Sequence, residues 1–112
     1  MKVFISQGMK GKTTEQIKTE RQNIIKRLKH IENIEVIDSF IPDGDKKDPV
    51  YCLGVAIQKL SEADMVVFTR DWYRFRGCKI EMSVAVEYEK MIWVLEWQGS
   101  VYICYVGCWV AL

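Results

Sequence analysis

The chain has 112 residues, of which 49% are hydrophobic and 28% charged, and this balance predicts one globular domain rather than a disordered segment. A formal net charge of +1 gives no general attraction to a nucleic-acid polymer or to an anionic membrane, so we expect neither as a partner. The apolar run 3–5 is too short for a secretory signal, and the four cysteines form no CxxC pair. We therefore expect a cytoplasmic protein with reduced thiols, no metal site and no cofactor.

Short apolar runs predict strands at residues 2–6, 34–38, 65–69 and 91–95. The segments between them predict helices at 14–30, 49–62 and 79–89. Alternation of strands and helices is typical of a parallel sheet with crossover helices. The predicted fold is a three-layer α/β domain over residues 1–95, Rossmann- or flavodoxin-like, with four to five parallel strands and flanking helices.

Residues 96–112 form a tail that differs from the rest of the chain. From Val101 onward it is apolar apart from Gly107, yet it is shorter than the roughly 20 residues that span a bilayer. We expect either an extra strand or a surface that a partner subunit buries, in a homodimer or a higher homo-oligomer. Weak association of the tail with a membrane is a minor alternative.

Ligands of parallel α/β sheets bind at the carboxyl ends of the strands, which selects residues 6–13, 38–41 and 69–77. Gly11-Lys12-Thr13 lies between a strand and a helix, where a phosphate-binding loop of an NTPase carries the same three residues. Ser6 occupies the position where that motif requires its first glycine, which argues against ATP or GTP hydrolysis. A glycine-containing turn at a helix start still offers backbone N–H groups to an anion.

Two stretches of the sequence together resemble a known family. They are residues 1–13 (MKVFISQGMKGKT) with Glu20-Arg21, and residues 60–68 (LSEADMVVF) with Trp72, residues 76–81 (RGCKIE) and Ala85. The chain resembles the small DUF4406 proteins, which are similar in turn to nucleoside 2-deoxyribosyltransferases and deoxynucleoside-monophosphate N-hydrolases. The likeness covers about residues 1–92, with Gly8 standing where the family usually carries proline, and it leaves the tail out.

This resemblance implies cleavage of an N-glycosidic bond in a nucleoside or nucleotide, by hydrolysis or by 2-deoxyribosyl transfer. A glycine turn followed by a helix with a glutamate in its first turn matches Gly77 and Glu81, which implies Glu81 as the nucleophile. The helix dipole near its N-terminus would keep Glu81 ionised. The family's aspartate at the start of the third strand matches Asp64, which would help to hold the sugar or base. Asp71 is the candidate for a second acid that protonates the leaving base.

Several residues around these positions are candidates for ligand binding. From the two loops and their neighbours we expect Ser6, Gln7, Gly8, Met9, Gly11, Lys12, Arg21, Asp38, Trp72, Arg76 and Gly77. Arg70, Arg74 and Arg76 are candidates to pair with a 5′-phosphate. Trp72 either stacks on the ligand or packs in the core, and Arg21 either faces the pocket or extends along the helix surface; the sequence leaves both pairs of alternatives open.

Three functions from different classes fit this sequence. The first is an enzyme that acts on N-glycosidic bonds through Glu81. The second is a protein that binds a nucleotide or a nucleotide-derived signal without turning it over. The third is a ligand-free assembly module driven by the apolar tail.

Overall fold

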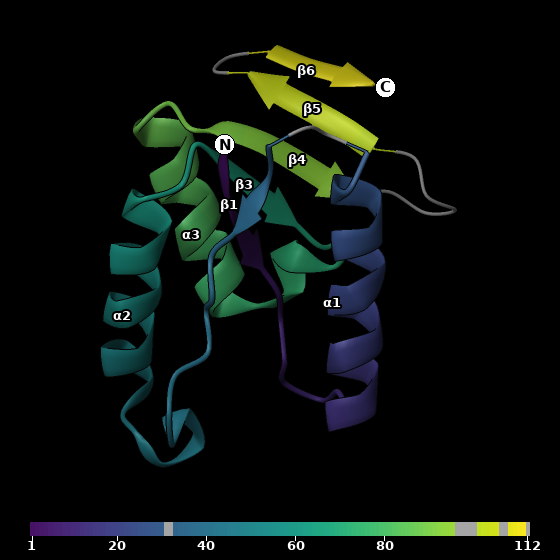
Figure 1. The fold of residues 1–112 in the computed structure, drawn as a ribbon. Helices are drawn as coiled ribbons and strands as arrows, with labels where there is room; N and C mark the ends of the chain where they lie inside the picture. The colour runs from purple at the N-terminus through teal and green to yellow at the C-terminus, as the bar shows by residue number, and fades with distance from the viewer. Residues whose placement is uncertain (31–32, 96–100, 106–107, 112) are drawn as a thin grey trace.

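The structure of the protein is a computed structural model that describes residues 1–30, 33–95, 101–105 and 108–111. Its elements in chain order are β1 (Lys2–Ser6), α1 (Thr14–Leu28), β2 (Glu35–Val36), the 3₁₀ turn η1 (Gly44–Lys46), α2 (Pro49–Ser61), β3 (Met65–Phe68), the 3₁₀ turn η2 (Trp72–Arg74), α3 (Arg76–Glu87), β4 (Met91–Leu95), β5 (Val101–Tyr105) and β6 (Cys108–Ala111). Figure 1 shows the helices on the two sides of a twisted sheet.

The strands form a single sheet in the order β2-β1-β3-β4-β5-β6. β2, β1, β3 and β4 are parallel to their neighbours, which confirms the predicted three-layer α/β fold with a parallel sheet. The tail adds two antiparallel strands, because β5 pairs with β4 and β6 folds back on β5. The parallel part of the sheet thus has four strands, as predicted, and the hairpin extends the described sheet to six.

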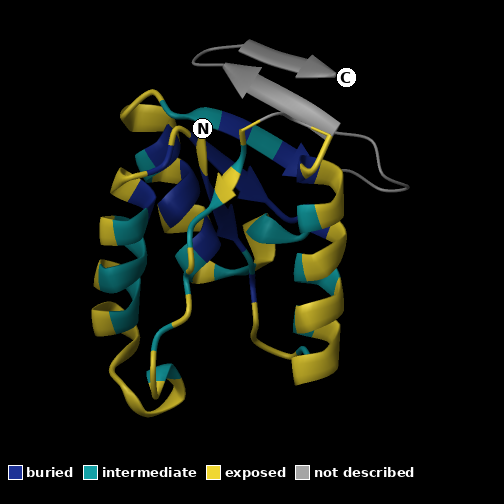
Figure 2. Ribbon diagram, viewed as in Figure 1, coloured by how far each residue is buried: buried dark blue, intermediate teal, exposed yellow. Residues whose placement is uncertain are grey.

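Side chains that alternate along each strand build two separate cores. On one face, Ile24 and Leu28 of α1 pack with Val3 and Ile5 of β1 and with residues of β3. On the other face, α2 and α3 cover a cluster of Phe4, Leu60, Ala63, Val66, Phe68, Met82, Ala85, Ile92 and Val94. Figure 2 shows the buried strands between helices whose outer sides are exposed. In the described part of the chain, no helix is long and apolar enough to cross a membrane.

The largest differences from the predicted bounds are in β2 and at the start of α3. β2 pairs only with β1 and is limited to Glu35–Val36, shorter than the predicted strand 34–38, because it lies at the edge of the sheet. α3 begins at Arg76, three residues before the predicted start at Lys79. Gly77 suggested a loop, but in the structure it lies in the first turn of α3, so the helix N-terminus reaches the edge of the sheet where ligands bind.

Candidate functional site

A cavity of about 440 Å³ opens at the carboxyl edge of the sheet, between the loop after β1 and the start of α3. Its lining residues are Gln7, Gly8, Met9, Lys10, Arg74, Phe75, Arg76, Gly77, Cys78 and Glu81. Seven of these are candidates that the sequence predicts, namely Gln7, Gly8, Met9, Arg74, Arg76, Gly77 and Glu81. The structure therefore brings the two predicted stretches together around one pocket, of a size that suits a small-molecule ligand.

Glu81 is a buried carboxyl group at the pocket wall, with 7% of the residue exposed. Burial raises the pKa of Glu81 to about 7, and a hydrogen bond from Ser6 opposes this shift. The expectation that the helix dipole keeps Glu81 fully ionised is therefore wrong. Because α3 begins at Arg76, Glu81 lies in its second turn, where the dipole has little effect, and desolvation decides.

Two further polar groups lie next to Glu81: Cys78, which lines the pocket, and Ser6, which is outside the pocket lining and bonds to the Glu81 carboxyl group. Ser6 is the last residue of β1, is 1% exposed, and donates a hydrogen bond from Oγ to Glu81 Oε1 at 3.4 Å. The Cys78 thiol is also buried, and burial raises its pKa to about 11 although its hydrogen bond with Ser6 opposes the shift. The thiol is therefore protonated at neutral pH and is not a nucleophile.

Phe75 and Gly8 form the contact between the two pocket walls. The Phe75 ring lies directly against Gly8, where a Cβ atom would overlap the ring. The Lys12 ammonium lies 5.0 Å from the centroid of the same ring. Because the Phe75 ring lies this close, position 8 requires a residue without a side chain, which is glycine.

Lys12 joins both walls through charge. Its ammonium group contacts Asp71 Oδ2 at 3.0 Å and Glu20 Oε1 at 3.0 Å. Burial alone would lower the pKa of Lys12, but the hydrogen bonds and charges of Asp71 and Glu20 outweigh it and raise that pKa. Lys12 is thus held by two carboxylates and lies outside the pocket lining, and its role in ligand binding stays a prediction.

Asp71 is unsuited to the role of the acid that protonates a leaving base. Burial would raise its pKa, but hydrogen bonds from Lys12 and Thr69, with the Lys12 charge, lower that pKa overall. The Thr69 hydroxyl donates to Asp71 Oδ1 at 2.8 Å. Asp71 is therefore an ionised carboxylate in an ion pair, and it does not line the pocket.

The start of α1 is already capped by the chain itself. Thr13 Oγ1 accepts from the Gln16 N–H, and the Gln16 side chain accepts from the Thr13 N–H. Gly11 has a φ of +80°, in a turn where the Lys12 N–H donates to the Met9 carbonyl. Gly11 shapes this turn without lining the pocket, and the N–H groups of Lys12 and Thr13 are used internally.

Four other predicted site residues lie outside the pocket. Asp64 precedes β3, at the opposite edge of the sheet from Glu81, and accepts a hydrogen bond from the Lys2 N–H at 2.8 Å. Arg21 contacts Ser39 and the Ile37 carbonyl, which ties α1 to the segment after β2. The structure thus brings neither Asp64 nor Arg21 to the carboxyl group of Glu81.

Asp38 and Trp72 have structural contacts of their own. Asp38 Oδ1 accepts from the Phe40 N–H in a local turn. Trp72 packs against the core cluster on the α2–α3 side and meets Phe68 edge to face, with ring centroids 6.0 Å apart. Of the two alternatives for Trp72, the structure therefore supports packing in the core.

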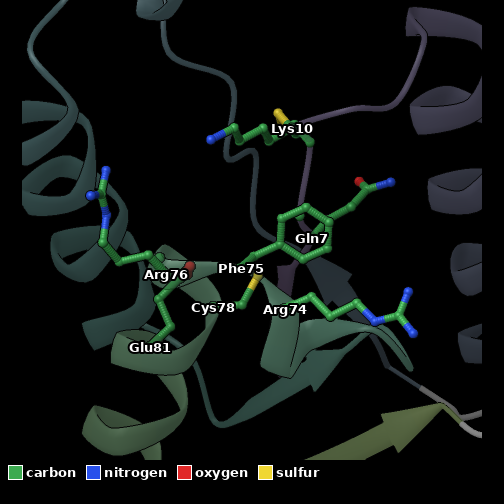
Figure 3. A pocket seen from close by; sticks show the side chains of 10 residues that line it. Gln7, Lys10, Arg74, Phe75, Arg76, Cys78 and Glu81 are labelled. Atoms are coloured by element: carbon green, nitrogen blue, oxygen red, sulfur yellow. The ribbon is translucent and has the colours of Figure 1, made fainter.

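The aromatic residue at the pocket is Phe75, which the sequence analysis missed along with Lys10 and Cys78. Its signal was the run Arg74-Phe75-Arg76-Gly77, in which an apolar ring stands directly before the helix start. Figure 3 shows Arg74 and Arg76 extending to opposite sides of Phe75, so in this conformation they do not converge on one phosphate. Lys10 extends toward the same side as Arg76 in this view.

Comparisons with known proteins add no relative to this picture. Within the described residues, no group of three or more His, Cys, Asp or Glu side chains is placed to hold a metal ion. No protein-family model matches the chain, and no curated protein matches it. The resemblance to the nucleoside 2-deoxyribosyltransferase-like proteins therefore stays a prediction from the residues quoted above.

Proposed function

We propose that the protein binds a nucleoside or nucleotide in the pocket around Glu81 and cleaves its N-glycosidic bond, by hydrolysis or 2-deoxyribosyl transfer. The observation that carries this proposal is the buried carboxyl group of Glu81 at the wall of a 440 Å³ pocket at the carboxyl edge of the sheet. Its pKa of about 7 lies close to the pH at which such a group would act.

The chemistry requires the ionised form of Glu81. The carboxylate forms a bond to C1′ of the sugar while the N-glycosidic bond breaks, and the base leaves with the bonding electrons. Water, or a ring nitrogen of a second base in transfer, then attacks C1′. The bond between C1′ and Glu81 breaks and regenerates the carboxylate, and the attacking group gives its proton to solvent. Because Asp71 is already ionised and lies outside the pocket, the leaving base takes its proton from solvent.

Cationic and aromatic groups support a nucleotide as the ligand. Lys10, Arg74 and Arg76 line the pocket and offer partners for an anionic group, while Phe75 provides an apolar surface. Gly77 places no side chain beside the Glu81 carboxyl group, where a Cβ would lie in ordinary van der Waals contact at 4.0 Å from Glu81 Oε1. The pocket thus combines the carboxyl group of Glu81, three cationic side chains and a volume that can hold a sugar.

The test is a panel of 2′-deoxynucleosides and their 5′-monophosphates, with release of free base measured by chromatography. We expect base release from at least one substrate, and a decrease of about a thousandfold or more in Glu81→Gln. Ser83→Ala is the matched control, because the Ser83 hydroxyl is exposed on the same helix and bonds to the Lys79 carbonyl. Equal activity in Glu81→Gln would overturn the assignment of the nucleophile.

A non-catalytic nucleotide-binding protein is the second candidate. It is favoured by Asp71, which is held by Lys12 and Thr69 and so leaves Glu81 without a second acid. Calorimetric titration with the same panel separates the two functions. Saturable binding without any released base would support the binding protein, and no binding of any compound would contradict both candidates.

A further inference from the structure

We propose that Ser6 is the positioning residue for Glu81: its buried hydroxyl orients the carboxylate and stabilises the ionised form. This inference rests on the proposed function only for its consequence in catalysis. The sequence placed Ser6 among the ligand-binding residues, but the structure gives its side chain a different partner.

The geometry at the end of β1 supports this role. Ser6 pairs with Phe68 in the parallel register of β1 and β3, so its backbone is fixed by the centre of the sheet. Its Oγ atom lies 3.4 Å from Glu81 Oε1, although the two residues are 75 positions apart in the chain. With Ser6 only 1% exposed, water does not readily replace its hydroxyl as a donor to Glu81.

The direction of the hydrogen bond follows from the neighbouring groups. An ionised carboxylate only accepts hydrogen bonds, so the Ser6 hydroxyl must donate to Glu81 in that state. The Cys78 thiol, whose pKa is raised to about 11 by burial, stays protonated at neutral pH, so it does not compete with the Glu81 carboxylate as a charged acceptor for the Ser6 hydroxyl.

The other charged groups of the pocket do not replace Ser6. Those that line it are Lys10 from the loop after β1, Arg74 from η2 and Arg76 from the start of α3. None of them forms a described ion pair with Glu81. The sequence has one histidine, His30, which follows the C-terminal end of α1 and does not line the pocket. Glu81 is therefore the pocket group whose titration is followed near neutral pH.

The experiment is an NMR titration of the Glu81 carboxyl carbon in ¹³C-labelled protein, which requires no enzymatic activity. In Ser6→Ala, loss of the donor should raise the titration midpoint by about 0.5 to 1 pH unit. Ser6→Thr keeps a hydroxyl and should restore the wild-type midpoint. Ser83→Ala removes an exposed hydroxyl from the same helix and should leave the midpoint unchanged.

The catalytic consequence is measured separately. If the ionised carboxylate is the nucleophile, kcat rises with pH through the Glu81 midpoint, and Ser6→Ala shifts this rise to higher pH. The variant should then be about 3 to 10 times slower than the wild type at pH 6 and nearly equal to it at pH 9. An unchanged or lowered NMR midpoint in folded Ser6→Ala overturns the role of Ser6. A raised midpoint in a protein that releases no base supports Ser6 and contradicts the proposed reaction alone.

Discussion

Burial of the Glu81 carboxyl group favours its neutral form, and this preference links the stability of the protein to pH. The folded-state pKa of Glu81 is raised to about 7, above the value of 4.5 for an exposed glutamate. Below about pH 4.5 both states are protonated and the full stability is present. Between about pH 4.5 and 7 the unfolded state ionises while the folded state stays protonated, so stability falls, and above pH 7 the full loss of roughly 3 kcal/mol is reached.

We therefore predict that Glu81→Gln stabilises the fold at high pH. At pH 8.5 the variant should exceed the wild type in free energy of unfolding by about 2 to 3 kcal/mol, whereas at pH 4 the two should be equal. Urea unfolding at both pH values measures the difference. Glu87→Gln, an exposed change in the same helix, should show no such dependence on pH. A Glu81→Gln variant that gains nothing at pH 8.5 would contradict the raised pKa.

The substitution Gly8→Ala tests the contact between the two pocket walls by adding a single Cβ atom. A Cβ at position 8 would overlap the Phe75 ring, so Gly8→Ala must displace that ring from the opposite wall. We expect a loss of about 1 to 3 kcal/mol in the free energy of unfolding. Gly54→Ala is the control, because Gly54 lies within α2 with open space around it. That change should stabilise the protein by about 0.5 to 1 kcal/mol, and equal effects at both positions would contradict the contact.

At the scale of elements, Lys12 holds the start of α1 against the loop before η2. Its two carboxylate partners, Glu20 and Asp71, come from α1 and from that loop, and each keeps about a third of its side chain exposed. Without the ammonium group these two negative charges have no common counter-ion. Lys12 therefore stabilises the arrangement of elements that gives the pocket its shape.

We predict that Lys12→Met lowers the free energy of unfolding by about 1 to 2 kcal/mol at pH 7. The lowered pKa of Asp71 means that this contribution is present above its ordinary titration range and is lost as the pH falls through the lowered value. Denaturant unfolding at pH 7 and pH 3 should therefore show a smaller difference at pH 3. Lys18→Met, an exposed change on α1, controls for loss of charge and should have little effect.

The elements that the sequence predicted well are those whose signal is local. β3 and β4 are continuous apolar runs between polar ends, and their predicted positions agree with the structure to within a residue. The start of α3 was missed because Gly77 is a loop signal that the helix tolerates in its first turn. Which aromatic residue faces the pocket was not predictable, because Trp72 and Phe75 differ only in the direction that η2 imposes on them.

The ion pairs between charged residues could not be predicted from the sequence either. Asp71 lies far from Lys12 and Glu20 in the chain, and its ion pair with Lys12 depends on how the loops after β1 and β3 meet. Motif spacing placed Lys12 and Asp71 at the same edge of the sheet, but it did not show that the two side chains form an ion pair.

At the scale of the whole molecule, the described core residues and the pocket lining belong to β1, β3, β4, the helices and the loops between them. β5 and β6 extend the sheet from β4 by antiparallel pairing, beyond the parallel strands that position the site (Figure 1). The hairpin therefore covers the hydrogen-bonding edge of β4.

We predict that a chain ending at Leu95 still folds but self-associates. Removal of β5 leaves the N–H and C=O groups along one side of β4 without partners, and an open strand edge pairs readily with another chain. The truncated protein should keep its far-UV circular dichroism and bind the same ligands, while light scattering after size-exclusion chromatography should show larger species than for the full chain. Replacing Ile92 or Val94 of β4 with lysine is not a suitable control, because both side chains are buried in the core. A truncated chain with a charged extension after residue 95 is the suitable comparison, and it should associate less.

If the truncated chain is unfolded instead, the hairpin belongs to the cooperative unit, since the parallel sheet and its helices would then be insufficient for a stable core.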